Sequence, residues 1–492
     1  MRERLKSNLS EKVIHYLFEP SIEGERNRSF ETMMAVNKAH LCMLVSEQII
    51  TKEVGTEILH ALNAITEGGS DRLEINPNLE DLYFNIEADL IKRVGVGIAG
   101  QLHTGRSRND LYITVTRMTS RQYTLQLCSL IMELRCTLLN LAEEKSTVVM
   151  TGYTHMQPAE PITLGHYFSG ILHAIERDFY RLMFAFQNTN HSPLGSGAMA
   201  STSFPINRKQ TARLLGFTDT MGNSLDGVAS RDFLLETLSS MNIFMNNISR
   251  LTYDLYIWST DEYALVEVGD SVAVSSSIMP QKKNPITLEH IKAKSAHVLG
   301  ELVSMTSSMK NTPFGHSRDI AAESHKGFWE SVSEVEATIS LTMETIKSLK
   351  FNEDRMLSRA MNNFCTVTEL ANMLVREVKI SFREAHQIVG YLVNQMIESN
   401  IKVTDINPEL INDASYALLN KEVLVSIESI QKAINPITNV ELKNVEGGPA
   451  PLEVISQLKV LRDRADNDQK WLEGQMNGIA KRKEILSNMK IQ

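Results

Sequence analysis

The sequence predicts an all-α protein built around a central bundle of long helices. Only 13 prolines and 25 glycines interrupt its 492 residues, whereas leucine, glutamate, lysine, methionine and alanine recur in long stretches and favour helices. Apolar residues also recur at spacings of three and four, which is the period of one helix face. Polar turn segments are concentrated at a few places, so the helices between them are long.

The best-defined helix is expected over 234–255, where seven apolar residues form a single stripe. A second stripe covers 111–128, and helical patterns return over 286–309 and 327–347. These segments place the bundle in the middle of the chain. The two stripes consist of Leu234, Leu238, Met241, Phe244, Ile248, Leu251 and Leu255, and of Leu111, Val115, Met118, Leu125 and Cys128.

The length suggests roughly three domains, since a domain averages about 150 residues. We expect an N-terminal helical domain over 1–110, the bundle over 111–363 and a C-terminal helical domain over 364–492. An irregular loop rich in proline and glycine, near 436–451, precedes a last charged helix at about 452–490. That loop favours a separate C-terminal domain.

Charge and composition argue against several classes of protein. The net charge of −9 and the pI near 5.9 disfavour a nucleic-acid partner. No glycine-rich phosphate loop is present, so nucleotide chemistry is not expected. The four cysteines lie far apart in the sequence, which argues against a metal site or a disulfide framework and for a reducing compartment. They are Cys42, Cys128, Cys136 and Cys365.

Targeting signals are not expected either. The N-terminal segment MRERLKSNLSEKVIHY is charged and has no apolar signal-peptide core. No run approaches the 18 or so apolar residues that span a bilayer. These features favour a soluble cytoplasmic protein with no membrane partner.

Polar junctions between the expected helices are the natural places for a ligand, because packed helices are rigid and side chains converge at their ends. Three junctions carry cationic, amide, hydroxyl and imidazole groups, which are donors for a polycarboxylate. A lone histidine such as His155 is more often structural than catalytic, so that alternative stays open. The junctions are HTGRSRND (103–110), GYTHMQPAEP (152–161) and VSSSIMPQKKNP (274–285).

The third junction has the composition of an anion clamp. Lys282 and Asn284 lie two residues apart, so both project to the same side of an extended loop. Three serines, Ser275 to Ser277, add hydroxyls beside them. For an isolated stretch of this kind a solvated surface loop is the commoner interpretation.

Seven segments together resemble one family. SSSIMPQKKNP resembles the signature loop of the aspartase/fumarase superfamily, and the other six resemble its argininosuccinate lyase branch. Their order along the chain, over about 35–458, is more specific than any one of them. The six are HTGRSRND, GYTHMQ, PLGSGA, NSLDGVASRDF, FREAH and GGPAP.

The resemblance implies a homotetramer with a central bundle of long helices and active sites built from loops of three subunits. It implies elimination of an amine from an N-substituted aspartate with release of fumarate, with argininosuccinate as the first substrate to expect. No metal, nucleotide or organic cofactor is implied.

Roles for individual residues also follow from the resemblance. Ser276 is the base that removes the Cβ proton, and His155, paired with Glu289, donates a proton to the leaving nitrogen. Lys282 and Asn284 stabilise the dianion, which is the main difficulty of the reaction. The other residues implied or considered as substrate contacts are Ser107, Arg108, Asn109, Thr154, Gln157, Asn37, His316 and Arg318.

The sequence departs from the family pattern at several positions. Ala321 and Ser324 stand where the family supplies an amide and a cation, and His316 stands in place of a tyrosine. Asn37 replaces a serine and Pro158 an arginine. Compensation by His316, Arg318 or His325 is one interpretation. The alternatives are another N-(1,2-dicarboxyethyl) amine, of the ethylenediamine-disuccinate type, as substrate, or an inactive crystallin-like structural protein.

Overall fold

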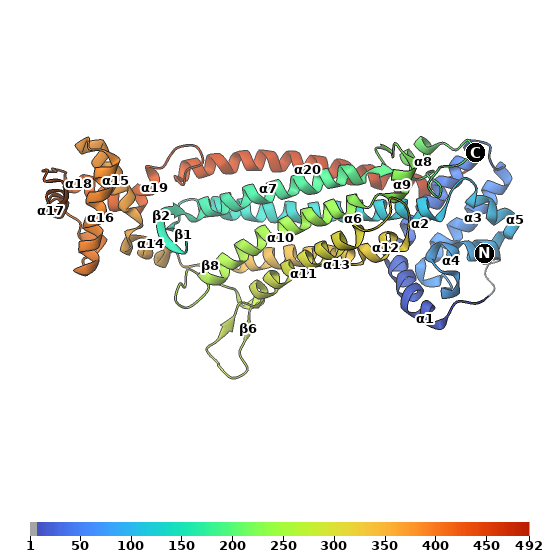
Figure 1. Ribbon diagram of the computed structural model, residues 1–492, viewed down its shortest axis with the longest axis horizontal. Helices are drawn as coiled ribbons and strands as arrows, with labels where there is room; N and C mark the ends of the chain where they lie inside the picture. The colour runs from blue at the N-terminus through green and yellow to red at the C-terminus, as the bar shows by residue number, and fades with distance from the viewer. Residues whose placement is uncertain (1–6, 492) are drawn as a thin grey trace.

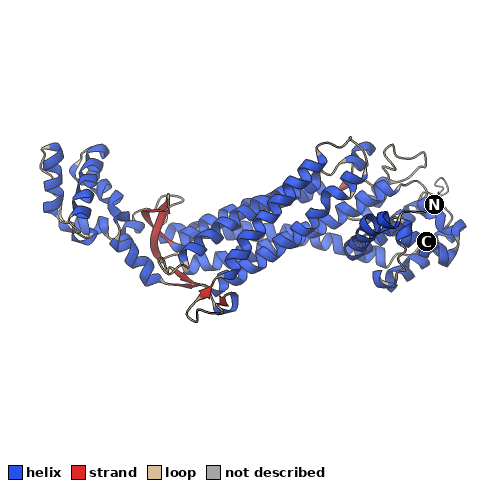
Figure 2. Cartoon of the chain, turned by 60° about the horizontal axis from the view of Figure 1, so that its bottom comes forward, coloured by secondary structure: helices blue, strands red, loops and turns tan. Residues whose placement is uncertain are grey.

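The computed structural model describes residues 7–491, so residues 1–6 and 492, at the ends of the first and third expected domains, lie outside it. The molecule is elongated, with helical clusters at both ends of a bundle of long helices (Figure 1). Strands are few and short in the described part (Figure 2). The expected all-α fold with a central long-helix bundle is therefore confirmed.

The bundle consists of long helices that pack side by side. The expected stripe over 234–255 is buried throughout, with each of its seven side chains at most 2% exposed. The last long helix packs along two of the others, whereas the sequence predicts it as part of the C-terminal domain over 364–492. The helices are α6 (Arg108–Glu144), α7 (Leu164–Thr189), α10 (Asp232–Trp258), α11 (Ile286–Met309), α13 (Lys326–Ser348) and the returning α20 (Pro451–Ser487).

Helix α6 is the one described helix long and apolar enough to cross a membrane. Its surroundings are those of a core helix, because α7, α13 and α20 pack against it. It also buries three arginines, of which Arg135 pairs with Asp468 at 2.6 Å. Ser107 caps its first turn and forms a capping box with Asp110, so the helix begins just before the expected boundary at 110.

The N-terminal cluster has its own apolar core, which residues from later in the chain complete, among them Leu194, Phe217 and Leu486. Its elements are α1 (Glu11–Val13), η1 (Ile14–Phe18), α2 (Glu19–Ser46), α3 (Lys52–Gly68), η2 (Ser70–Arg72), η3 (Pro77–Leu79), α4 (Leu82–Val94), α5 (Val96–Ala99), η4 (Gly100–His103) and, from the later segments, α8 (Arg208–Leu214) and α9 (Ser224–Ala229).

At the opposite end, short helices enclose a third core, which contains residues between Leu370 and Ile434 and none from α20. We propose domain boundaries near 110 and 363, with α20 assigned to the bundle. The elements at this end are α14 (Glu353–Asn362), η7 (Phe364–Thr366), α15 (Val367–Val378), α16 (Phe382–Glu398), η8 (Val403–Asp405), α17 (Pro408–Leu419), α18 (Ile427–Ile434) and α19 (Pro436–Glu441).

Candidate site residues lie on junctions between these parts. The segment expected as a polar turn at 152–161 is instead part of an antiparallel hairpin, because β-branched and aromatic residues such as Val149, Thr151 and Tyr153 favour strands. A two-residue antiparallel ladder joins the two ends of the signature loop, pairing 274–275 with 283–284. The elements are β1 (Val149–Thr154), β2 (Gln157–Thr163), β6 (Val274–Ser275), β7 (Lys283–Asn284), α12 (Arg318–Ala321) and η6 (Glu323–His325); the remaining strands are β3 (His191–Ser192), β4 (Asp219–Thr220), β5 (Val266–Glu267) and β8 (Lys350–Phe351), and η5 (Asp270–Val272) precedes β6.

Candidate active site

The candidate residues lie in three separate groups within one chain. The first group surrounds the start of α6, and the second lies on the β1–β2 hairpin that follows the end of α6. Since α6 has 37 residues, it separates these groups by about 55 Å. The signature loop forms the third group, and the 24 residues of α11 separate it from the first by about 36 Å. One chain therefore does not bring all the groups together.

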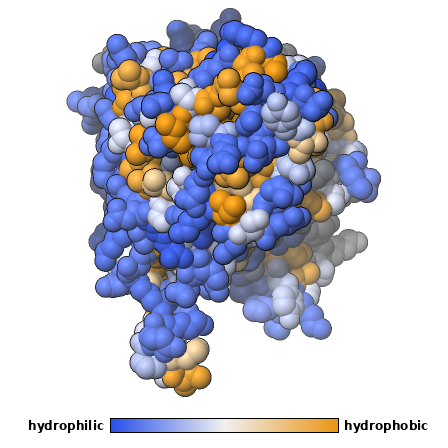
Figure 3. Space-filling view, turned by 90° about the vertical axis from the view of Figure 1, so that its left-hand side faces the viewer, coloured by the Kyte–Doolittle hydropathy of each residue, from blue (hydrophilic) through white to orange (hydrophobic). Residues whose placement is uncertain are grey.

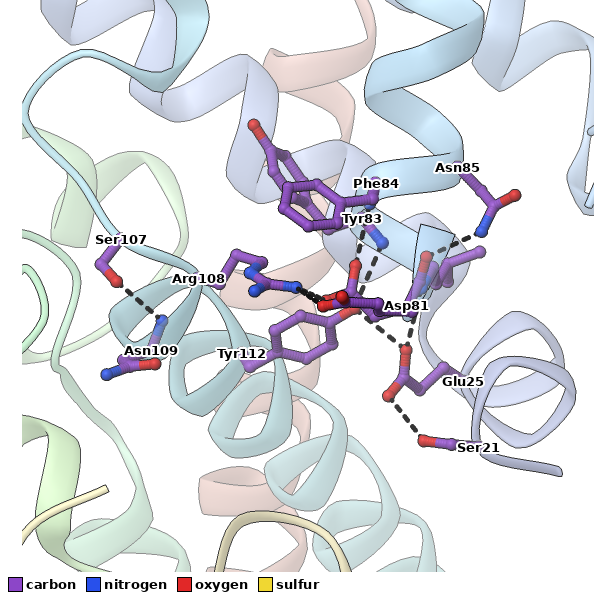
Figure 4. Close-up of polar contacts among 12 residues, drawn as sticks. Ser21, Glu25, Asp81, Tyr83, Phe84, Asn85, Ser107, Arg108, Asn109 and Tyr112 are labelled. Atoms are coloured by element: carbon purple, nitrogen blue, oxygen red, sulfur yellow. Dashed lines mark hydrogen bonds and ion pairs between the residues drawn. The ribbon is translucent and has the colours of Figure 1, made fainter. Parts of the chain in front are cut away.

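Arg108 is the centre of the first group (Figure 4). Its Nη1 donates to Asp81 Oδ2 at 2.6 Å and to Glu80 Oε2 at 3.4 Å, and its guanidinium lies 4.0 Å from the centre of the Phe84 ring. Burial raises the pKa of Asp81, while the Arg108 charge opposes that rise. These contacts fix the direction of the guanidinium at the first turn of the helix.

The neighbouring candidates in this group have mainly structural contacts. Ser107 Oγ accepts from Asn109 N at 3.2 Å, and Asn109 Nδ2 donates to Ala198 O at 3.1 Å. Asn37 is fully buried, and its Oδ1 accepts from Arg106 Nη2 at 2.6 Å. In this chain Asn37 therefore orients Arg106, which also donates to Tyr83 Oη at 3.3 Å.

A half-buried carboxyl near Arg108 was not predicted from the sequence. Glu25 Oε2 accepts from Tyr112 Oη at 3.1 Å and from Leu82 N at 3.3 Å, and its Oε1 accepts from Ser21 Oγ at 3.2 Å (Figure 4). Burial, together with the charge of Asp81, raises the pKa of Glu25 to about 7. No motif marks this residue, because its surroundings come from three segments distant in sequence.

A cavity of about 680 Å³ lies beside this group, between α2 and the segment that contains α12 and η6. Arg108, Arg318, Glu25 and Ala321 line it. Ser324 is buried and donates to Ile320 O at 2.9 Å, so its hydroxyl caps a helical turn. The cavity thus has charged walls, while Ala321 contributes only a methyl group.

The two histidines of this segment are neutral at pH 7. Burial and the charges of Arg231, Arg318 and Arg108 lower the pKa of His316 to about 4. Burial, with Arg231 and Arg28, lowers the pKa of His325 to about 3. Neither histidine therefore replaces the cation that the family has at the position of Ser324.

The second group lies at the tip of the hairpin. Thr154 pairs with Gln157 across the ladder, and the two residues between them have φ of 52° at His155 and 59° at Met156. Glycine and asparagine are the usual residues at such positions, so the tip is strained. All four side chains are exposed, so His155 faces outward from this chain.

The third group lies on the signature loop, which projects from the lower side of the molecule (Figure 3). Its tip is apolar, with Ile278 82% exposed. Ser276 Oγ accepts from Met279 N at 3.1 Å and from Ile278 N at 3.4 Å. Two N–H donors on one oxygen favour its anionic form, which a serine base requires.

The charged side chains near this loop divide into paired and unpaired ones. Lys283 Nζ contacts Asp270 at 2.6 Å and Glu267 at 2.9 Å, whereas Lys282 makes no ion pair with any described carboxylate. Glu289 accepts from Tyr256 Oη at 3.4 Å and does not contact His155 within the described part of the chain. Lys282 is therefore available for a ligand.

The raised pKa of Glu25 makes a testable contribution to stability. Its value of about 7 lies above the ordinary 4.5, so the folded state holds this proton more tightly, and the resulting stabilisation is lost as pH rises through 7. Glu25→Gln should remove this pH dependence. We expect the variant to gain about 1–3 kcal/mol relative to wild type between pH 5 and pH 8, measured by urea unfolding at both values. A stability difference independent of pH would contradict the assignment.

Known proteins resemble this chain over most of its length. A family model described as lyase matches residues 4–300, and one described as argininosuccinate lyase C-terminal matches 364–441. Argininosuccinate lyase 1 of Shouchella clausii is 48% identical over 94% of this chain and 93% of that protein. Argininosuccinate lyase of Methanocaldococcus jannaschii is 39% identical over 100% and 99%. The solved structure of an EDDS lyase variant with bound fumarate has 31% identity and a TM-score of 0.88, covering 98% of this chain and 95% of that one.

Proposed function

Because this chain belongs to the argininosuccinate lyase family, we propose that it cleaves argininosuccinate to arginine and fumarate. The observation that carries the proposal is the 48% identity to an argininosuccinate lyase over 94% of the chain. Membership makes the chain a fumarate-releasing carbon–nitrogen lyase of the aspartase/fumarase superfamily, and arginine biosynthesis follows from the family. An inactive structural protein is not supported.

In the proposed mechanism the Ser276 alkoxide removes the Cβ proton of the succinyl part. Charge then accumulates on the adjacent carboxylate, where Lys282 and Asn284 stabilise it. Each such preorganised donor contributes on the order of 3–4 kcal/mol. His155, with Glu289 on its second ring nitrogen, protonates the leaving nitrogen. The two N–H donors on Ser276 Oγ and the unpaired Lys282 support these roles.

Arg108, Asn109, Thr154 and Gln157 complete the proposed binding site for the succinyl carboxylates, with Ser107 holding the turn. Arg108 has carboxylate partners in this chain, so a substrate carboxylate would compete with Asp81 for its guanidinium. Arg318 is exposed at the same cavity and offers a second cation. The neutral His316 offers only hydrogen bonds.

We further propose that the enzyme is a homotetramer whose active sites combine three subunits. The first group of candidate residues lies too far from the other two groups to act with them within one chain. The bundle also exposes large apolar side chains, which a monomer would leave in water. They include Phe184, Ile243, Tyr253, Leu299 and Val303, between 39% and 57% exposed.

Assembly should therefore be measurable as complementation between inactive variants. We expect Arg108→Met and Ser276→Ala to be inactive alone, while co-refolded mixtures regain part of the activity, because some sites combine two intact groups. Sedimentation velocity should show a tetramer at micromolar concentration. A fully active monomer, or mixtures that stay inactive although mixed tetramers form, would contradict the shared site.

The test of function is the release of fumarate, followed by its ultraviolet absorbance, with argininosuccinate as substrate and arginine quantified as the second product. A kcat/KM above about 10⁴ M⁻¹s⁻¹ is in the ordinary range for a native substrate. Failure to release arginine would overturn the proposal.

A second substrate class is favoured by a specific observation. Ala321 and Ser324 lack the polar groups expected for the amino-acid part, and the EDDS lyase variant with bound fumarate has the same fold at 31% identity. Adding a panel of amines and diamines to fumarate, with arginine as one member, separates this alternative from argininosuccinate.

We also propose a cytoplasmic location, since all four cysteines are free in the described chain, as a reducing compartment would keep them. The proposed chemistry uses only side chains and backbone N–H groups.

A further inference from the structure

Arg28 is a cation on the wall of the cavity beside Arg108, and no described carboxylate forms an ion pair with it. It lies on α2, three residues after Glu25, so both project from the same helix face. Among the described residues it makes no hydrogen bond and no ion pair, and its Nε is buried without a partner. Burial lowers its pKa, although as an arginine it stays charged at neutral pH.

Its guanidinium is nevertheless held in place. It lies 5.2 Å from the centre of the Trp329 ring, and a Cβ on Gly24 would stand 3.0 Å from both terminal nitrogens. The glycine one turn earlier therefore leaves room for the guanidinium against the helix. Trp329 also contacts His325 edge-on, with ring centres 6.3 Å apart. A positioned, unpaired guanidinium suits a planar anion.

We propose that Arg28 binds the carboxylate of the amino-acid product, and so selects amines that carry a carboxylate. The inference rests on the proposed function and deepens it. Arg108 lines the same cavity and, in the proposed function, binds a carboxylate of the succinyl part. Ala321 and Ser324 cannot hold an anion, and the lowered pKa values leave His316 and His325 neutral. Arg318 is the arginine of this segment and is exposed, so Arg28 adds a further, half-buried cation on the cavity wall.

The test compares arginine with agmatine, which is arginine without its carboxylate, in the addition to fumarate. For Arg28→Met we expect kcat/KM with arginine to fall about 10- to 100-fold, while the value with agmatine changes less than about twofold. Arg28→Lys keeps the charge and should recover part of the loss. Wild type should prefer arginine to agmatine.

The matched control is Arg26→Met on the same helix. Arg26 contacts Ser70 O and Asp71 instead, so its loss should leave the ratio of arginine to agmatine unchanged. Equal losses with both amines in Arg28→Met, or no preference for arginine in wild type, would overturn the inference. If Arg28→Met does not fold, the ratio of kcat/KM for arginine to that for agmatine, measured in Arg28→Lys and in wild type, still tests the inference.

Binding separates this inference from the proposed function. Calorimetric titration with arginine or agmatine in the presence of fumarate, made in a Ser276→Ala background that lacks the proposed base, reports carboxylate recognition without turnover. Wild type that fails to cleave argininosuccinate would sink the proposed function, yet Arg28-dependent preference for arginine would still uphold the inference. Cleavage of argininosuccinate, combined with a preference for arginine that is unchanged in Arg28→Met, would support the proposed function and overturn the inference.

Discussion

Replacing Ser276 by alanine is expected to lower the rate of elimination about a thousandfold or more. General base catalysis contributes about 10² to 10⁴, and the loop over 274–285 contains no carboxylate or histidine that could replace Ser276 as the base. Ser276 lies on a projecting loop and packs in no apolar core, so the variant should remain folded. Single-turnover measurement of fumarate release isolates the chemical step.

Ser277 is the matched control for this prediction. It is exposed, and none of the described N–H groups donates to its hydroxyl, whereas Ser276 Oγ accepts from two. Ser277→Ala should keep near-full activity. If the two variants exchanged their effects, the base would be the next serine along the chain.

Lys282→Met is expected to lower turnover about 10²- to 10³-fold, the usual cost of removing one donor to a developing oxyanion. Lys283→Met should change it less than about threefold. The reason lies in the ladder Ser275 to Lys283, which directs the Lys283 side chain to Glu267 and Asp270. Lys282 lies just before strand β7 and makes no ion pair with a described carboxylate.

The two lysine variants are compared by kcat and by KM for the same substrate. A loss in kcat for Lys282→Met indicates an interaction made in the transition state, whereas a loss in KM alone indicates ground-state binding. Thermal midpoints control for folding, and the exposed pairs of Lys283 should contribute little to them. Equal, small effects of both substitutions would remove the anion-clamp argument.

Much of the fold could be predicted from the sequence because it depends on local periodicity. The apolar stripe over 234–255 is the buried face of α10, and the patterns over 286–309 and 327–347 match α11 and α13 within one residue. The family assignment was predictable for a similar reason, since seven short segments in a fixed order are a property of the chain itself, and it is confirmed.

The hairpin over 149–163 was not predicted, because Gly152, Pro158 and Pro161 within its strands are residues typical of turns. The path of α20 was not predictable either. Its sequence shows a charged helix, yet whether it packs on the C-terminal core or on α6 and α7 depends on residues more than 250 positions away.

The helix stripes, the family and the chemical types of the candidate residues follow from the chain alone, because each of these is set by neighbours along the chain. Which charges are paired depends on the folded arrangement, since pairing requires proximity in space. In the folded chain Arg108 forms an ion pair with Asp81, whereas Arg28 and Lys282 have no carboxylate partner among the described residues. Glu25 lies half-buried among segments that no sequence motif connects. The folded arrangement also separates the candidate residues into three groups, because a long rigid helix keeps its two ends apart.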